Sequence, residues 1–308
     1  MTILVTGSDG LVGYALRNLK LEDVYFATRQ DADLTNREQT MQLFSRIRPS
    51  QVIHLAAQVA GIGGNMMSSA EYFRNNILIN VNTLEAAKDF GVAKLISFMS
   101  TCVFPSEGPY PLDSKKMHDG PPHPSNFGYA YAKRMLDVQT RAYRHQWGMN
   151  FFTAIPCNIY GPNVNYSLVE GHVIPALIHK LHLANTQGLE FKIWGDGTPK
   201  REFIYSLDMA KIIIWMLKNY DSDQPLIVAP REEISIRQVA ELLASEMKYD
   251  RALKFDETKP NGQERKPSNS NTFYSSYDGG ALTSFSIGLS ESVKWFLSNY
   301  PRVRGVHE

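Results

Sequence analysis

The stretch Gly7-Ser8-Asp9-Gly10-Leu11-Val12-Gly13 decides the fold of this chain. It follows the apolar run Ile3-Leu4-Val5, which is typical of a buried strand, and it opens a segment with leucines at helical spacing. The glycines allow a tight turn and let a pyrophosphate approach the N-terminus of the helix, where free N–H groups favour negative charge. A glycine loop alone could be an ordinary turn, but in this position it predicts a dinucleotide-binding unit.

Short apolar strands alternate with amphipathic helices through the first half of the chain. Strands are expected at residues 3–5, 24–27, 51–57, 94–101 and 151–159. Helices are expected near residues 11–19, 35–47, 69–90 and 125–147. The second of these helices opens with Thr35 and Glu38, which have the spacing of a capping box. This alternation predicts an α/β fold of the Rossmann type, a doubly wound parallel sheet whose strands all end on the side where ligands bind.

The end of the second strand indicates which dinucleotide is bound. Folds that select NAD often carry an acid there for the ribose 2′-hydroxyl, whereas this strand ends Ala27-Thr28-Arg29. A basic residue suits the 2′-phosphate of NADP, so we expect NADPH as cofactor; the alternative is that Arg29 is a solvated surface residue. Asp33 and Leu34 are expected beside the adenine, although Asp33 could instead belong to the entry of the next helix.

After Pro162 the alternation breaks, and stretches rich in Gly and Pro separate shorter helices. We therefore expect an NADP-binding Rossmann domain over residues 1–162, with a returning segment near 200–222. Residues 163–199 and 223–308 are expected to form a smaller, irregular α/β lobe that binds the substrate.

Composition excludes several other classes of protein. The 308 residues are 43% hydrophobic and 20% charged, with a net charge of +1, so bulk charge indicates neither nucleic acid nor a membrane surface as partner. Two cysteines are too few for a disulfide scaffold, and no cluster of His or Cys suggests a metal site. The chain starts without the pattern of a secretion signal and has no apolar run of membrane-spanning length, so a cytoplasmic location is expected.

Tyr129 and Lys133 form a Y-x-x-x-K pattern in the helix expected at 125–147. Residues four apart share a helix face, and an ammonium near a phenol favours the phenolate, so the tyrosine could exchange a proton with a carbonyl oxygen during hydride transfer. Tyr131 lacks such a partner, because Met135 is four residues on. The pattern is common in helices, but one strand after the glycine-loop unit, with Ser100 ending the preceding strand, it predicts a reductase site.

Together these features resemble the extended short-chain dehydrogenase/reductase family. The match includes His54-Leu55-Ala56-Ala57, Asn158-Ile159-Tyr160-Gly161-Pro162 and Arg201-Glu202-Phe203-Ile204-Tyr205. One branch of the family, which epimerises C3 and C5 of GDP-4-keto-6-deoxy-D-mannose and then reduces C4, is similar over residues 1 to about 270. Five further runs carry that similarity: 31–35 (DADLT), 100–105 (STCVFP), 126–129 (NFGY), 171–175 (GHVIP) and 194–197 (WGDG).

The resemblance implies two sets of binding residues. Those for NADPH/NADP are Gly7, Ser8, Asp9, Gly10, Leu11, Val12, Gly13, Arg29, Asp33, Leu34, Ala56, Ala57, Tyr129, Lys133, Pro156, Asn158, Ile159 and His172. Those for the substrate are Lys180, Trp194, Arg201, Asn261 and Lys266. Asn261 stands where some relatives have Asp, the three cations could be solvated surface residues, and Trp194 could be a core aromatic.

The catalytic set that the resemblance implies is Ser100, Cys102, Tyr129, Lys133 and His172. Cys102 stands where related 4,6-dehydratases carry an acidic pair. Removing a proton from the carbon next to a ketone needs a base, and a thiolate can serve, while His172 matches the family's acid on the opposite face of the sugar. The structural alternatives are a small buried residue for Cys102 and a helix-cap histidine for His172.

The expected reaction is conversion of GDP-4-keto-6-deoxy-D-mannose to GDP-L-fucose by 3,5-epimerisation followed by NADPH-dependent reduction at C4. Alternatives are another nucleotide-sugar epimerase or 4-reductase, or a non-catalytic NADP sensor on the same fold. The family also implies a homodimer, formed through the helices near 69–90 and 125–147.

Overall fold

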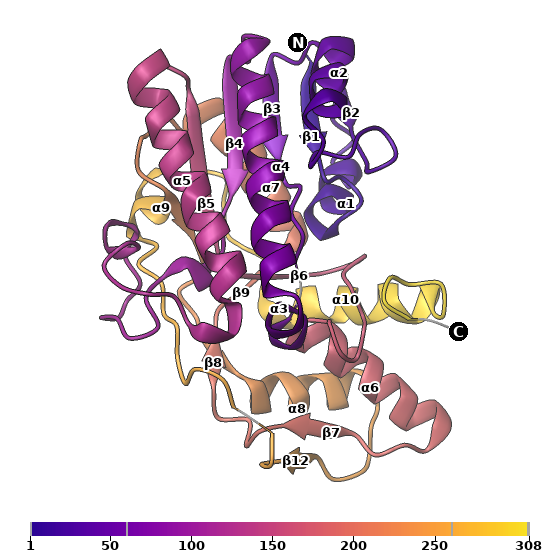
Figure 1. Ribbon diagram of the computed structural model, residues 1–308. Helices are drawn as coiled ribbons and strands as arrows, with labels where there is room; N and C mark the ends of the chain where they lie inside the picture. The colour runs from indigo at the N-terminus through magenta and orange to yellow at the C-terminus, as the bar shows by residue number, and fades with distance from the viewer. Residues whose placement is uncertain (1, 60, 260, 307–308) are drawn as a thin grey trace.

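A parallel sheet of six strands forms the centre of the protein, in the order β10-β5-β4-β3-β1-β2 (Figure 1). The computed structural model describes residues 2–59, 61–259 and 261–306. The strands of this sheet are β1 (Ile3–Thr6), β2 (Val24–Phe26), β3 (Gln51–His54), β4 (Lys94–Phe98), β5 (Phe151–Pro156) and β10 (Leu226–Val228). The prediction of a doubly wound α/β fold is confirmed.

Helices cover both faces of this sheet, so each strand is apolar on both sides. On one face lie α1 (Leu11–Asn18) and α7 (Ser206–Asn219), and on the other lie α2 (Arg37–Ile47), α4 (Ser69–Asp89) and α5 (Phe127–Trp147). Neighbouring residues of one strand therefore enter different cores: Val5 packs with the α7 side, and Leu4 with the α4 side. This is why the strands appear in the sequence as continuous apolar runs.

The chain leaves β1 toward β2 on one side and returns to β3 on the other, which creates a crevice at the carboxyl ends of β1 and β3. Gly7, directly after β1, has φ +67°, and a Cβ there would lie 2.6 Å from Cα of Ala56. A Cβ on Gly13 would lie 2.3 Å from the carbonyl oxygen of Ser8. Glycine is required at both positions because the backbones approach too closely for any side chain.

A second lobe lies below the carboxyl ends of the strands in Figure 1 and has its own core. It contains α6 (Val173–Gln187), α8 (Ile236–Glu246) and α10 (Phe285–Asn299), with β7 (Lys192–Trp194) paired to β12 (Lys254–Asp256) and β8 (Lys200–Arg201) paired to β11 (Ile234–Ser235). The short elements are α3 (Ile62–Met67), α9 (Asn271–Ser276), η1 (Thr101–Val103), η2 (Ser114–Lys116) and η3 (Pro124–Asn126). A search of the described ranges finds no helix with the length and apolarity needed to cross a bilayer.

The strand expected at 151–159 is two strands. β5 ends at Pro156, and β6 (Asn158–Tyr160) pairs instead with β9 (Phe203–Tyr205), outside the central sheet. A proline has no N–H with which to extend the ladder, and the N–H of Cys157 donates to Val228 on the neighbouring strand. Pro156 and Asn158, which are predicted to contact the cofactor, therefore lie on either side of a strand boundary.

The segment expected to return to the first domain at 200–222 extends further than expected. The chain continues into β10, which pairs with β5, so residues 226–228 belong to the central sheet and not to the lobe. Phe273 of α9 is buried in the same core, again within the stretch assigned to the lobe. Phe273 covers the apolar face of β10, which would otherwise be exposed at the edge of the sheet.

Helix α2 begins one residue later than the capping-box pattern predicts. Asn36 is its cap, and the side chain of Asn36 accepts a hydrogen bond from the N–H of Gln39. Thr35 cannot serve because its N–H and hydroxyl both donate to Asp33, at 3.0 and 2.8 Å. The acidic side chain thus shapes the turn before the helix.

Candidate active site

The glycine loop lies at the crevice and offers backbone groups to a ligand. Gly10 stands at the start of α1 with no side chain to cap it, so the helix keeps free N–H groups there. The hydroxyl of Ser8 is buried and accepts a hydrogen bond from Arg17 at 2.9 Å. The carbonyl of Asp9 accepts a hydrogen bond from Asn163 of the second lobe at 3.1 Å. The loop is therefore held from both sides, and residues 7–13 have the geometry predicted for them.

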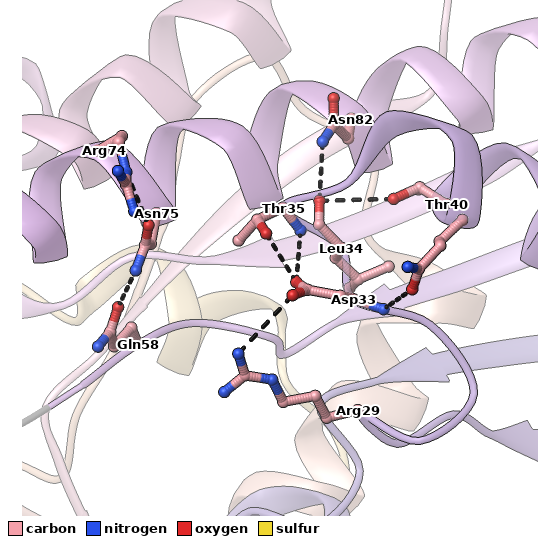
Figure 2. Close-up of polar contacts among 10 residues, drawn as sticks. Arg29, Asp33, Leu34, Thr35, Thr40, Gln58, Arg74, Asn75 and Asn82 are labelled. Carbon is pink, nitrogen blue, oxygen red and sulfur yellow. Dashed lines mark hydrogen bonds and ion pairs between the residues drawn. The ribbon is translucent and has the colours of Figure 1, made fainter.

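Arg29 follows β2 with 87% of its side chain exposed, and its guanidinium is 3.7 Å from the carboxylate of Asp33 (Figure 2). Hydrogen bonds from Thr35 lower the pKa of Asp33, and Arg29 contributes less to this shift. Asp33 therefore does have the helix-entry role that the sequence left open. Its pair with Arg29 is exposed and so contributes little energy, which leaves the guanidinium available for a phosphate.

Asparagines of α4 fix the backbone around the expected adenine site. Asn82 donates to the carbonyl of Leu34 at 2.9 Å, and Asn75 donates to the side chain of Gln58 at 2.7 Å (Figure 2). Asn76 accepts from the N–H of Gln58 at 2.9 Å and donates to its carbonyl at 3.0 Å. These contacts hold the loop that carries Ala56 and Ala57. These asparagines were not predicted as site residues, although several asparagines in a long helix are unfavourable unless their side chains make hydrogen bonds.

Tyr129 and Lys133 lie on the buried side of α5, in the predicted register. Lys133 is 3% exposed, donates to the carbonyl of Phe98 at 2.9 Å, and has its ammonium 5.9 Å from the centre of the Tyr129 ring. Tyr131 instead packs edge-on against Phe127, with ring centres 5.0 Å apart. The helix therefore separates the two tyrosines into a site residue and a packing residue.

The expected effect of Lys133 on Tyr129 is wrong for the free protein. Burial raises the pKa of Tyr129 well above its usual value, and the nearby thiol of Cys102 adds to the rise. Burial also lowers the pKa of Lys133 to about 8. Desolvation outweighs the attraction between ammonium and phenolate because both groups are deep in the protein. A tyrosine that retains its proton is suited to donate it to an alkoxide.

Ser100 and Cys102 lie beside this pair. The hydroxyl of Ser100 accepts a long hydrogen bond, 3.5 Å, from the N–H of Cys102 and caps the 3₁₀ turn η1. Cys102 is half-buried and packs with Tyr129 and Tyr72. Burial raises the pKa of the Cys102 thiol, while Ser100, Lys266 and Lys133 oppose the rise in that order. The thiol is thus partly accessible and has cations nearby, unlike an inert core cysteine.

His172 comes from the other lobe, directly before α6. His172 is the N-cap residue of α6, so the helix-cap position is as the alternative interpretation had it, but the side chain makes no capping hydrogen bond. The ring reaches solvent, yet the surrounding protein lowers its pKa. No hydrogen bond or ion pair within the described residues joins His172 to the four residues above, and its role stays a prediction.

Trp194 ends β7 with 52% of its surface exposed, which excludes the core-aromatic interpretation. The ammonium of Lys180 lies 4.9 Å from the ring centre and that of Lys259 lies 5.8 Å from it. Lys180 also donates to the carbonyl of Lys192 at 3.3 Å, and burial lowers its pKa. The ammonium of Lys180 is therefore fixed by a hydrogen bond and is not a freely solvated surface cation. Lys259, which also lies near Trp194, was not among the residues predicted from the sequence.

Two more predicted cations and Asn261 lie nearby. Burial lowers the pKa of both Arg201 and Lys266, and the proximity of Arg201 further lowers that of Lys266. Asn261 accepts a hydrogen bond from the N–H of Asp196 at 2.9 Å. That bond holds the turn at Gly195, which has φ +76°. The carbonyl oxygen of Asn261 thus already has a structural partner.

The fold and site define a class of nucleotide-dependent enzyme, and the chain belongs to the NAD dependent epimerase/dehydratase family, whose model matches residues 3–229. The GDP-L-fucose synthase of Dictyostelium discoideum is 46% identical over 311 residues, covering 98% of this chain and 97% of that protein. A probable GDP-L-fucose synthase of Drosophila melanogaster is 41% identical, covering 98% and 99%. A crystal structure of the Naegleria fowleri GDP-L-fucose synthetase bound to NADP has a TM-score of 0.93, with 37% identity and coverage of 98% and 96%.

Proposed function

We propose that this protein converts GDP-4-keto-6-deoxy-D-mannose to GDP-L-fucose by 3,5-epimerisation and NADPH-dependent reduction at C4. The observation that carries the proposal is Cys102 beside Tyr129, in a site that Ser100 and Lys133 complete. A plain reductase needs the Ser–Tyr–Lys set alone. The relatives named GDP-L-fucose synthase support the choice of sugar nucleotide.

The crevice fits NADPH. Gly7 and Gly13 let the loop backbone pack closely against Ala56 and Ser8, and α1 offers uncapped N–H groups to the pyrophosphate. Arg29 would hold the 2′-phosphate, and Lys133 the nicotinamide ribose. When bound, NADPH supplies the hydride for C4. The relative solved with NADP supports this cofactor.

The side chains then divide the proton transfers among them. Ser100 and Tyr129 donate hydrogen bonds to the C4 oxygen, which acidifies the protons on C3 and C5. The Cys102 thiolate removes the proton from one carbon, and His172 delivers a proton to the opposite face of that carbon. After Cys102 has lost its proton to solvent and His172 has regained one from solvent, the same exchange inverts the second carbon. After inversion at both carbons, Tyr129 gives its proton to the C4 oxygen as that carbon is reduced.

The cations on the second lobe suit the diphosphate of the substrate. Lys180, Arg201 and Lys266 are each partly withdrawn from water, which strengthens a contact with an anion. The exposed ring of Trp194 lies beside Lys180 and offers a flat apolar contact. Asn261 would contribute its remaining amide donors.

The reaction is tested by incubation with GDP-4-keto-6-deoxymannose and NADPH in D₂O, following loss of NADPH absorbance and deuterium uptake together. We expect GDP-L-fucose with deuterium at C3 and C5. Oxidation of NADPH without deuterium uptake would identify a 4-reductase instead. Binding of NADPH without any turnover would identify a sensor.

We expect Arg29→Asp to weaken NADPH binding by about tenfold or more and NADH binding little, since a charge-assisted hydrogen bond is worth about 1.5–3 kcal/mol. Fluorescence titration with both cofactors measures this. Arg37→Asp, a change of the same charge at the exposed start of α2, is the matched control. Equal losses for the two cofactors would remove Arg29 from the 2′-phosphate site.

We also propose a homodimer formed through α4 and α5. The outer surfaces of these helices expose Phe73, Val81, Met135 and Val138, each about two-fifths exposed. An apolar hollow between the helices adds Ile77 and Leu136. Such a patch on a monomer favours association with a second copy. Val138→Glu is expected to yield a monomer in sedimentation velocity, whereas Leu242→Glu on α8 should not; a dimer surviving Val138→Glu contradicts this interface.

A cytoplasmic location is the last part of the proposal. Both cysteines, Cys102 and Cys157, are free thiols. A catalytic thiol is preserved in a reducing compartment, where disulfides are rare.

A further inference from the structure

A small recess opens beside Cys102, at the boundary between the two lobes. Its lining includes Cys102, Lys266, Gln263, His123 and Tyr110. Cys102 lies in η1, the turn that follows β4, whereas Lys266 comes from a segment more than a hundred residues later. The recess therefore places a cation of the second lobe next to a thiol of the first.

The segment that carries Lys266 is fixed to the loop after Cys102. The side chain of Gln263 donates to the carbonyl of Ser106 at 3.3 Å. The N–H of Leu112 donates to Pro267 at 2.7 Å, and the N–H of Asn269 donates to Leu112 at 2.8 Å. These bonds surround Lys266 on both sides in sequence, so its backbone is held close to the recess.

Glu202 anchors the segment that carries Lys266 through a second set of hydrogen bonds. It is only 4% exposed, and its two carboxylate oxygens accept hydrogen bonds from the N–H and the hydroxyl of Ser268, at 2.9 and 2.6 Å. Burying a carboxylate is costly, and burial raises the pKa of Glu202 above its usual value. Because Ser268 is two residues after Lys266, this buried clamp fixes the direction from which Lys266 approaches.

We propose that Lys266 is the cationic partner of the Cys102 thiolate, and that Glu202 positions Lys266 by holding Ser268. This rests on the proposed function, since it concerns the base of the epimerisation. An ammonium close to a sulfur favours the thiolate over the thiol and so offsets the cost of burial at Cys102.

Several titratable or charged groups face Cys102, and they differ in whether they already make hydrogen bonds to other residues. They are Lys133, Tyr129 and Arg134 of α5, Tyr72 of α4, His123 and Tyr110 of the loop before α5, and Lys266. Lys133 donates to Phe98, and Arg134 donates to Val103 at 2.6 Å. Lys266 makes no hydrogen bond or ion pair with the described residues, so its three donors stay available beside the sulfur.

The test is the pH dependence of Cys102 alkylation by iodoacetamide in the full chain without substrate. The chain has two cysteines, so peptide mass spectrometry follows each separately. We expect Lys266→Met to move the midpoint upward by roughly one pH unit, with alkylation at neutral pH about tenfold slower. The plateau rate at high pH reports access to the thiol and should change less. Lys266→Arg should restore most of the effect, and Lys259→Met, which removes a charge near Trp194, should not move the midpoint.

Glu202→Gln should move the midpoint in the same direction but less, because an amide can accept only one of the two bonds from Ser268. In the variant carrying both Glu202→Gln and Lys266→Met, the Glu202 change should add nothing, since its effect passes through Lys266. Additive shifts would overturn the positioning role. Ser268→Ala breaks the same contact with a smaller change and serves if Glu202→Gln does not fold.

An unchanged midpoint in Lys266→Met would overturn the proposal while leaving the proposed function intact, because no sugar nucleotide takes part. A shifted midpoint in a protein that does not turn over the GDP sugar would uphold the coupling of Lys266 to Cys102 and count against the proposed function.

Discussion

Cys102→Ser is expected to slow epimerisation about 10²–10⁴-fold, the range that one general base contributes. Serine has nearly the same shape as cysteine, but its hydroxyl is far less acidic, so it cannot supply a comparable base. NADPH affinity should persist, since Cys102 packs with Tyr129 and Tyr72 and is not among the residues expected to hold NADPH. The variant should still reduce the unepimerised ketone slowly and yield GDP-6-deoxy sugars of the D series. NMR of the products in D₂O measures both rates.

His172→Gln is the companion variant, because it should remove the acid and leave the base. Net epimerisation should stop, whereas deuterium washout at C3 should continue in part. Near-normal GDP-L-fucose formation by Cys102→Ser would contradict the assignment of the Cys102 thiolate as the base. It would also remove the main reason for distinguishing this protein from a reductase without epimerase activity.

Tyr129→Phe is expected to lower reduction at C4 by about 10²–10⁴-fold, since the proton for the C4 oxygen is lost. The raised pKa of Tyr129 means that this residue is protonated and ready to donate across the neutral range. Deuterium exchange at C3 or C5 should stay detectable because Cys102 is intact. NADPH oxidation and exchange are measured on one sample.

Tyr131→Phe is the matched control on the same helix, because Tyr131 packs against Phe127. It should keep near-wild-type reduction. If Tyr131→Phe proved the more damaging change, the division of roles along α5 would have to be reversed.

The parts of the site that local sequence determines could be predicted. Gly7 and Gly13 are required because other backbone atoms lie too close for a Cβ. Tyr129 and Lys133 are four residues apart in α5, so they lie on the same face of the helix. The break between β5 and β6 was missed, although Pro156 and Asn158 interrupt the apolar run. The pairing of β6 with β9, which local sequence does not reveal, separates the two strands. The cap at Asn36 was missed since Asp33 competes for Thr35.

The pKa shifts of the site residues could not be predicted from the sequence either. Whether Lys133 or burial dominates the pKa of Tyr129 depends on depth in the protein, which spacing does not give. The same holds for Lys266, whose closeness to Cys102 depends on Glu202 and on the loop at Leu112. Asn261 was predicted from resemblance alone. Its hydrogen bond with Asp196 joins residues far apart in the sequence, so only the folded structure reveals it.

The late arrival of β10 has a consequence for synthesis on the ribosome. Until Leu226–Val228 has emerged, β5 is the outer strand of the sheet, with its N–H and C=O groups unpaired along one edge. An unpaired apolar edge invites pairing with other chains, so a nascent chain of about 160–220 residues is the stage most exposed to aggregation and to chaperones. A chain cut between β5 and β10 would therefore keep this edge unpaired, so an expressed fragment needs Leu226–Val228 to complete the sheet.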